Sequence, residues 1–279
     1  MSDAFYVPEG DTFVSTELTR GPWDPGSQHA GPPAALVARE IERLPTHDGP
    51  RQVGRVTYEI LRPVPIAPLA VSARIARPGR RVEMAEATLA TASGEELVRA
   101  RAWRLGRSEV DVPPGLTGEG GSGEPGALAS TLRPGLAPPG PEAGERRPFF
   151  DTGHDVGYHT AMDYRFVSGA FLDPGPATVW MRMRQPLVAS EEPSPLQRVL
   201  AAADSGNGVS ATLDYSEFVF INVDLTVHLH RMPAGDWVCL DAITVPEREG
   251  VGLSDTALYD ERGPIGRVAQ TLLVGARPR

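Results

Sequence analysis

The chain repeats one pattern twice. Residues 55–103 can be laid on residues 224–272 by a shift of 169 positions without a gap. The turn before the last expected strand, "ASGEE" in one half and "ERGPI" in the other, then falls at the same place, and a segment beginning "TFVS" at residue 12 resembles one beginning "RFVS" at residue 165. A period of this length indicates two similar domains in one chain rather than a stack of short repeats. Seven identities accompany the shift: Thr57 with Thr226, Arg62 with Arg231, Ala73 with Ala242, Val82 with Val251, Leu89 with Leu258, Gly94 with Gly263, and Ala100 with Ala269.

A stretch rich in glycine and proline separates the two copies. Residues 106–150 contain 10 Gly and 8 Pro, and a segment of this composition buries too little apolar surface to fold as a domain. We therefore expect an N-terminal unit over 1–105, a linker over 106–150 and a C-terminal unit over 151–279. Each unit is long enough to bury a core of its own.

Composition and charge exclude several classes of protein. The chain is 41% hydrophobic and 23% charged, as soluble globular proteins are, and its net charge of −9 argues against nucleic acid as the main partner. No apolar stretch approaches the roughly 20 residues that span a bilayer, and the acidic start of the chain is unlike a secretion signal. The single cysteine, Cys239, permits no internal disulfide and lies in an apolar run typical of a buried structural thiol. We expect a cytoplasmic protein that does not insert into membranes.

One helix is expected in each half. In the first half Pro32 and Pro33 open a helix that runs to about Leu44, because proline suits the first helical turn, where its missing N–H would have no partner. In the second half Ser194 is a candidate N-cap before a helix that runs to about Asp204.

Strands are expected after each helix. The clearest is "FINVDLTVHLHR", in which the apolar residues from Val223 to Leu229 alternate with polar ones. Each half then reads as strand, helix and antiparallel meander, which predicts the α+β class.

In this order of elements the chain resembles the acyl-CoA thioesterase family with a double hotdog fold, the family that includes acyl-CoA thioesterase II. The resemblance rests in the first half on "HAGPPAALVAREI", "VTYEILRPVPIAPL" and "RPGRRVEMAEATL", and in the second on "LAAADSGNG", "FINVDLTVHLHR" and "GRVAQTLLVGARP". It implies a tandem hotdog, each unit a long central helix wrapped by an antiparallel sheet. It also implies an acyl-CoA substrate and no cofactor beyond the CoA that the substrate carries.

The same resemblance implies three catalytic residues, all in the second unit. Family members activate a water with an Asp, a Ser or Thr, and a Gln, and the matching positions are Asp204, Asn222 and Gln270. Asn222 departs from the family pattern, although an amide can still hold a water. Thr226, four residues further on, is an alternative for the hydroxyl. Under the shift of 169, Gln270 falls opposite Arg101, so the second copy is expected to carry the polar site.

The resemblance further implies that the start of the first helix binds the thioester oxygen. Backbone N–H groups there would stabilise the developing oxyanion. Pro32 and Pro33 have no N–H, which leaves Gly31 and Ala34 as backbone donors and His29 as a side-chain donor. For the phosphates of CoA, the candidates are Arg77, Arg80 and Arg81 in the turn "RPGRR".

Other interpretations stay open at this point. His228 and His230 lie on one strand face near Asp224, but no third and fourth ligand for a metal are evident, and we expect no metal. A hotdog hydratase would need a His soon after the Asp, where this chain has Val209 and Ser210. A protein that binds acyl-CoA or an acyl group without hydrolysing it is the main alternative. A homodimer is the default expectation for the assembly.

Overall fold

The computed structural model describes residues 3–46, 49–112 and 137–277. Within these ranges one 13-stranded sheet forms, and each pair of neighbouring strands is antiparallel. The first half contributes β1 (Tyr6–Glu9), β2 (Thr12–Ser15), η1 (Glu17–Thr19), α1 (Gly31–Arg43), β3 (Arg51–Ile60), β4 (Pro68–Arg77), β5 (Val82–Thr91) and β6 (Glu96–Gly106). The second half contributes η3 (Pro141–Ala143), α2 (Tyr158–Ala161), β7 (Met162–Ala170), β8 (Asp173–Met183), α3 (Pro195–Ala203), α4 (Gly206–Val209), β9 (Phe218–Asn222), β10 (Asp224–Leu229), β11 (Val238–Pro246), β12 (Val251–Asp260) and β13 (Gly263–Ala276). The order across the sheet is β1-β2-β4-β5-β6-β3-β10-β13-β12-β11-β8-β7, and β9 pairs with β13.

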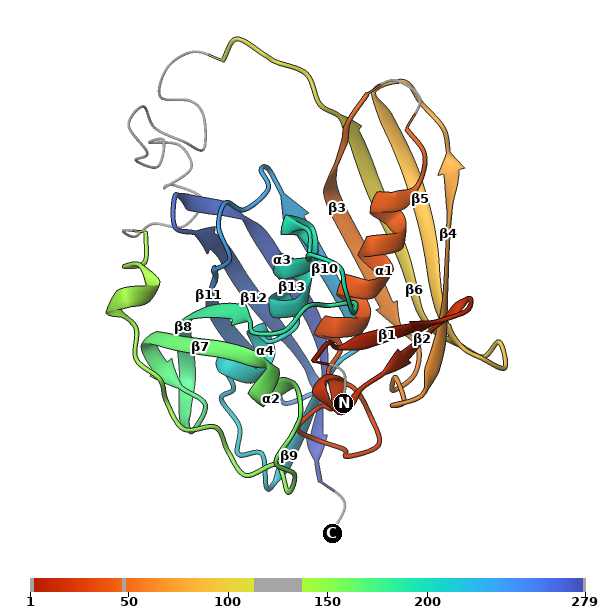
Figure 1. Cartoon of the computed structure of the whole chain (residues 1–279). Helices are drawn as coiled ribbons and strands as arrows, with labels where there is room; N and C mark the ends of the chain where they lie inside the picture. The colour runs from red at the N-terminus through yellow and green to blue at the C-terminus, as the bar shows by residue number, and fades with distance from the viewer. Residues whose placement is uncertain (1–2, 47–48, 113–136, 278–279) are drawn as a thin grey trace.

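The two halves meet at β3 and β10, which pair in the middle of the sheet (Figure 1). Thr57 lies directly opposite Thr226, and the two hydroxyl oxygens are 3.2 Å apart. These residues are equivalent in the repeat, so a pseudo-twofold axis passes between them. The same shift of 169 places β5 on β12 from end to end. The repeat seen in the sequence is therefore a repeat of structure.

The gapless shift is wrong for the last strand of each half. Thr57 pairs with Arg101, whereas its equivalent Thr226 pairs with Ala269. The offset between β6 and β13 is thus 168, because the hairpin loop before β13 is one residue shorter. Gln270 corresponds to the buried Ala102 and not to Arg101. The likeness of "TFVS" to "RFVS" does not join equivalent strands either. "TFVS" lies in β2, the second strand from one edge of the sheet, whereas "RFVS" lies in β7, the edge strand on the other side.

The two predicted helices are present and lie side by side on one face of the sheet (Figure 1). α1 has proline in its first turn, and the Ser194 hydroxyl caps α3 by accepting from the Gln197 N–H at 3.2 Å. The start of α1 lies at the end of α3, so the helices are antiparallel. The expectation of a long central helix in each unit is met only in part: α1 has 13 residues, but α3 has 9, and a turn at Asp204 and Ser205 separates it from the short, glycine-containing α4.

The expected strand "FINVDLTVHLHR" is broken in two. β9 ends at Asn222 and β10 begins at Asp224, and Val223 between them is 45% exposed. Leu225, Val227 and Leu229 face the core as predicted, but the break reverses the alternation before them. Asn222 therefore faces the helix side of the sheet, while Thr226 faces the opposite side.

Much of the predicted linker, residues 113–136, lies outside the described residues. Its described end packs against the second half. The Trp180 indole N–H donates to the Pro139 carbonyl at 2.7 Å, and Glu145 and Phe166 exchange backbone hydrogen bonds.

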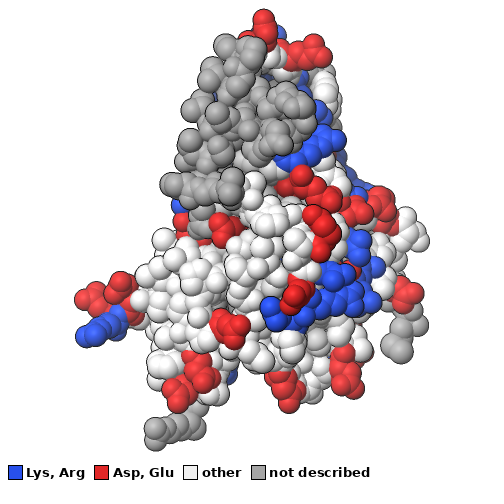
Figure 2. All heavy atoms as spheres, turned by 90° about the vertical axis from the view of Figure 1, so that its left-hand side faces the viewer, with Lys and Arg blue, Asp and Glu red and all other residues white. Residues whose placement is uncertain are grey.

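The surface carries its charge in separate groups. Figure 2 shows the side that lies on the left in Figure 1, where β7 and β8 lie; basic residues form separate groups there, the largest at mid-height on the right, and acidic residues lie between and around them. The described atoms of this side form no continuous basic surface of the kind that binds a phosphate backbone. None of the helices in the described ranges is long and apolar enough to cross a membrane.

Candidate active site

A cavity of about 550 Å³ lies where the start of α1, the end of α3 and β9 meet. Both halves line it, since His29 and Arg62 come from the first and Asp204 and Asn222 from the second. One side of the cavity is polar, and much of the rest is formed by aromatic rings. The described residues lining it thus include side chains that can position a water beside a large apolar surface.

The structure brings Asp204, Asn222 and Gln270 together. Asp204 is the C-cap of α3, and its Oδ1 accepts from Asn222 Nδ2 at 2.8 Å and from Gln270 Nε2 at 3.3 Å. The Gln270 amide also donates to the Asp204 backbone carbonyl at 3.3 Å, and its oxygen accepts from the Asn207 N–H at 3.2 Å. With 1% exposure and no place in the cavity wall, Gln270 holds Asp204 from behind.

His29 is the nearest cation-forming partner of Asp204. Its Nδ1 lies 3.2 Å from Asp204 Oδ2 and also accepts from the Gly31 N–H at 3.1 Å. One ring nitrogen cannot carry a proton and accept one at the same time, so the two contacts exclude each other. Burial lowers the pKa of His29, an effect that the nearby Asp204 carboxylate opposes, and the imidazole is neutral near pH 7.

Tyr158 fixes the position of the imidazole. The two rings stack at 3.7 Å between centroids with 10° between their planes. The Tyr158 hydroxyl donates to the Ala201 carbonyl at 2.6 Å and lies 2.9 Å from the Ser205 hydroxyl. Burial raises the pKa of Tyr158 well above its usual value, so this phenol is a structural support and not an acid at neutral pH.

The start of α1 offers fewer free donors than expected. The Ala34 N–H donates to the Ala30 carbonyl at 3.0 Å within the helix, so the prediction of Ala34 as an oxyanion donor is wrong. The Gly31 N–H faces His29. Gly31 is also required by packing, since a Cβ there would lie 2.3 Å from the Ala201 carbonyl oxygen of α3.

The structure does not bring Arg77, Arg80 and Arg81 to the cavity. In their turn the Gly79 carbonyl accepts a hydrogen bond from Arg51 Nη2. The turn lies beyond the C-terminal end of α1, whereas the cavity lies at the start of α1. A helix of 13 residues separates the two places by about 20 Å. The arginines that line the cavity are Arg62 and Arg277. In the sequence Arg62 stands out only as one of the seven identities of the repeat, where it matches Arg231.

Two other sequence candidates lie away from the cavity. Thr226 is at the pseudo-twofold axis on the opposite face of the sheet, so it does not replace Asn222. His228 lies in β10 and His230 just after it, and the nearby Asp224 carboxylate accepts from the Thr271 N–H at 2.6 Å. No group of three or more His, Cys, Asp and Glu side chains in the described ranges is placed to hold a metal ion. Cys239 is buried, and burial raises the pKa of its thiol.

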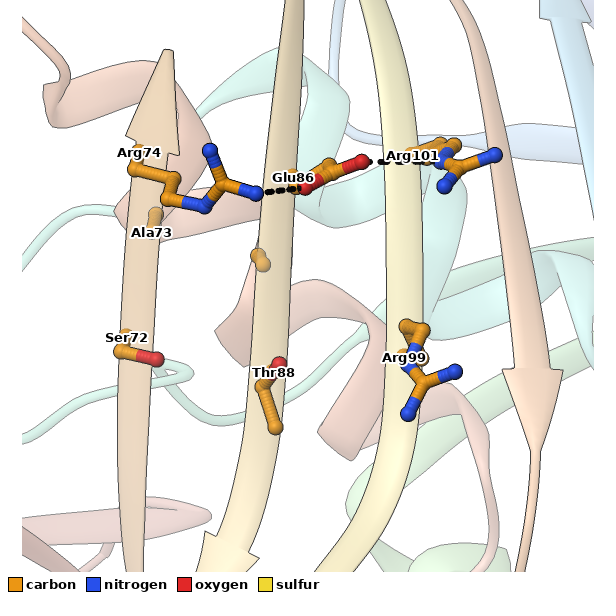
Figure 3. A pocket seen from close by; sticks show the side chains of 8 residues that line it. Ser72, Ala73, Arg74, Glu86, Thr88, Arg99 and Arg101 are labelled. Carbon is orange, nitrogen blue, oxygen red and sulfur yellow. Dashed lines mark hydrogen bonds and ion pairs between the residues drawn. The ribbon is translucent and has the colours of Figure 1, made fainter. Parts of the chain in front are cut away.

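A second hollow, of about 410 Å³, lies on the outer face of β4, β5 and β6 (Figure 3). Arg74 and Arg101 point toward Glu86 from the two flanking strands and pair with it, at 3.0 Å for Arg101 Nε. The charges of these exposed side chains are paired with one another, and exposed ion pairs of this kind are common on sheet surfaces without a bound ligand. We therefore place the candidate site in the cavity at the helix ends.

The first half lacks the equivalent site. Through the strand pairings, Asn222 corresponds to Val53 and Gln270 to Ala102, and both of these are buried apolar residues. The carboxylate at the mirrored helix end is Glu42, which accepts from Ser194 Oγ at 2.7 Å and Gln197 Nε2 at 3.1 Å. The hydrogen-bonded set of Asp204, Asn222 and Gln270 is therefore present only on the second-half side of the pseudo-twofold axis.

Two sequence models of one family match the chain. The model of the acyl-CoA thioesterase N-terminal domain matches residues 19–105, and that of the acyl-CoA thioesterase C-terminal domain matches residues 137–274. A search of curated protein sequences finds no match.

Solved structures resemble the chain over almost its whole length. A protein assigned as a thioesterase II from Thermobifida fusca has a TM-score of 0.69 at 17% identity and covers 97% of this chain and 95% of its own. A protein from Alicyclobacillus acidocaldarius described as having a hot dog fold has a TM-score of 0.68 at 16% identity, covering 100% and 97%. The acyl-CoA thioesterase II TesB2 of Mycobacterium marinum has a TM-score of 0.62 at 15% identity, covering 96% and 94%. At these identities the likeness shows the hotdog fold alone.

Proposed function

Because the chain belongs to the acyl-CoA thioesterase family, we propose that it hydrolyses an acyl-CoA thioester to a free acid and CoA with a water held by Asp204. The observation that supports this most is the Asp204 carboxylate in the cavity wall, with Oδ1 fixed by Asn222 and Gln270 and Oδ2 directed to His29. A carboxylate oxygen has two lone pairs, so Oδ2 can face His29 and also accept from a water while Oδ1 stays with the two amides.

The reaction needs one proton carrier. The water oxygen forms a bond to the thioester carbon while one of its protons passes to Asp204. When the tetrahedral intermediate collapses, the carbon–sulfur bond breaks and the sulfur takes that proton, which restores the carboxylate. Asn222 orients the acceptor, and Gln270 acts as a positioning residue because it lies behind Asp204.

The tautomer of His29 decides whether the Gly31 N–H is free to bind the substrate. When a proton sits on Nδ1, the imidazole donates to Asp204 and the Gly31 N–H loses its acceptor. The carbonyl oxygen of a bound thioester then supplies a new acceptor for the Gly31 N–H. In this proposal the oxyanion donor is released in the neutral tautomer that carries its proton on Nδ1, and Asp204 stays the one group that takes up the proton of the water.

The CoA part is proposed to lie at the cavity mouth near Arg62 and Arg277. Both are exposed and line the cavity; Arg62 Nε pairs with Glu95 at 3.0 Å, and Arg277 Nε donates to the Tyr215 carbonyl at 2.8 Å. Guanidinium groups bind phosphate oxygens well. No cofactor beyond CoA enters the proposed reaction.

One observation favours binding without hydrolysis as a second candidate function. Pro32 and Pro33 have no N–H, and the Gly31 N–H already has an acceptor, so the start of α1 presents no free oxyanion donor. A protein of this kind would hold the thioester intact.

The test is release of free thiol from acyl-CoAs by the full chain, with Asp204→Asn as the variant and Glu42→Gln, the mirrored carboxylate, as its matched control. We expect Asp204→Asn to lower kcat by about 10²–10⁴, the range for general-base catalysis, and Glu42→Gln to keep wild-type kcat. Full activity in Asp204→Asn would overturn the assignment of the base. Calorimetric binding of an acyl-CoA with no thiol release would favour the binding function.

A further inference from the structure

Aromatic residues concentrate in the cavity. The chain has only 4 Trp, 6 Tyr and 8 Phe, yet half of these 18 residues line this one cavity. They come from segments far apart in the sequence, including the end of the predicted linker. The nine are Trp23, Phe149, Phe150, Tyr158, Tyr164, Phe171, Tyr215, Phe218 and Phe220.

Four of the rings, those of Trp23, Phe150, Tyr215 and Phe220, form a cluster in the cavity wall. Trp23, Phe150 and Tyr215 lie 4.8 to 5.0 Å from one another between centroids, and the ring of Phe220 is 5.2 Å from that of Tyr215. Trp23 is 47% exposed although it is the largest of them. A wall of this kind presents ring faces and edges to whatever enters the cavity.

The cluster lies next to the proposed catalytic residues. Phe220 and Asn222 are two residues apart on β9 and face the same side, which separates their Cα atoms by about 7 Å. The Tyr215 hydroxyl donates to the Gly208 carbonyl at 2.6 Å, and this ties the cluster to α4, directly after Asp204. A group only a few bonds from a carbonyl held at Asp204 therefore meets aromatic rings.

We propose that the acyl group of the substrate is aromatic, with its ring one to three bonds from the thioester carbonyl, as in a phenylacetyl thioester. The inference rests on the proposed function and names its substrate class. The physical reason is the ring quadrupole: a substrate ring can stack offset on Phe150 and Tyr215 or meet their edges, which a saturated ring of the same size cannot do as well.

The test compares phenylacetyl-CoA with cyclohexylacetyl-CoA, two substrates of nearly equal size that differ in aromaticity. We expect kcat/KM of the wild type to favour the aromatic substrate by about two- to tenfold. Trp23→Leu and Phe150→Leu should bring this ratio close to one. Trp103→Leu is the matched control. The Trp103 ring lies outside the cavity, under the guanidinium group of Arg77, so its loss should leave the ratio unchanged.

The outcomes separate this inference from the proposed function. Hydrolysis of both substrates at equal kcat/KM, or a ratio that survives Trp23→Leu together with Phe150→Leu, overturns the aromatic class and leaves hydrolysis standing. If neither substrate nor octanoyl-CoA is cleaved, hydrolysis fails, and the ratio of the two dissociation constants measured by calorimetry then decides the inference by the same criterion.

Discussion

His29 Nδ1 lies 3.2 Å from Asp204 Oδ2, and these two residues come from different halves of the repeat. The contact exists because α1 and α3 run antiparallel, which places the start of one helix at the end of the other. A close approach of Gly31 to the Ala201 carbonyl and the stacking of His29 on Tyr158 hold this arrangement. Neither half contains the complete candidate site, so the proposed chemistry depends on the pairing of β3 with β10.

The buried imidazole predicts a dependence of stability on pH. Burial lowers the pKa of His29 below its usual value of 6.5 in the folded protein. As the pH falls through about 6.5 the unfolded chain binds a proton that the folded protein takes up only at lower pH, so stability decreases. We expect the difference in Tm between wild type and His29→Asn to shrink between pH 8 and pH 5.5. A difference that is constant over this range would contradict burial as the cause. His159→Asn serves as a comparison, because burial lowers the pKa of His159 as well but it makes no contact with Asp204.

The polar site should be lost when it is given the residues of the first half. Asn222→Val and Gln270→Ala copy Val53 and Ala102, and each removes a donor to the Asp204 carboxylate. Hydrogen bonds to a charged group contribute about 1.5–3 kcal/mol, so we expect kcat to fall by about 10- to 100-fold in each variant. Asn222→Ser restores the hydroxyl of the family pattern and should stay within about tenfold of wild type. Equal activity of Asn222→Val and wild type would remove Asn222 from the mechanism.

The sequence predicted that Asp204, Asn222 and Gln270 lie together, and their hydrogen bonds agree with that placement. The order of elements and the helix end at Asp204 follow from local signals such as the Ser194 cap and the glycine-rich turn. The family resemblance predicts Gln270 next to Asp204, and the hydrogen bond between their side chains agrees with it. The shift by 169 matches Gln270 to Arg101, whereas the strand pairings match it to Ala102. The face of Asn222 could not be read from alternation, because a break at Val223 reverses it.

Other parts could not be read from the chain. An arginine cluster in a turn does not reveal at which end of a helix it will lie, and Arg77, Arg80 and Arg81, the residues predicted to bind the CoA phosphates, do not line the cavity. Phe149 and Phe150 line the cavity, but the high glycine and proline content of residues 106–150 as a whole predicts a linker there. Long-range contacts of this kind are decided by packing and not by local pattern.

Gly31 should tolerate no side chain. A Cβ at this position would lie 2.3 Å from the Ala201 carbonyl oxygen, so Gly31→Ala must push α1 away from α3. Overpacking of this type costs about 1–3 kcal/mol, and we expect the free energy of unfolding in urea to fall by that amount. Gly208→Ala is the control, because a Cβ there meets nothing within 4 Å. A stable Gly31→Ala protein would show that the two helices can separate without cost.

Binding of CoA should depend on the arginines at the cavity mouth and not on those of the distant turn. We expect Arg62→Gln and Arg277→Gln each to raise KM for an acyl-CoA by about 5- to 30-fold, because each removes a charge-assisted bond to phosphate, with little change in kcat. Arg80→Gln and Arg81→Gln are the matched controls and should leave KM unchanged, since their turn lies beyond the other end of α1. Raising the salt concentration should weaken binding to the wild type more than to Arg62→Gln, because screening acts on exposed charges. The reverse pattern, with KM raised only by the two control substitutions, would move the CoA site to the β4–β5 turn and require the substrate to reach the cavity from that end.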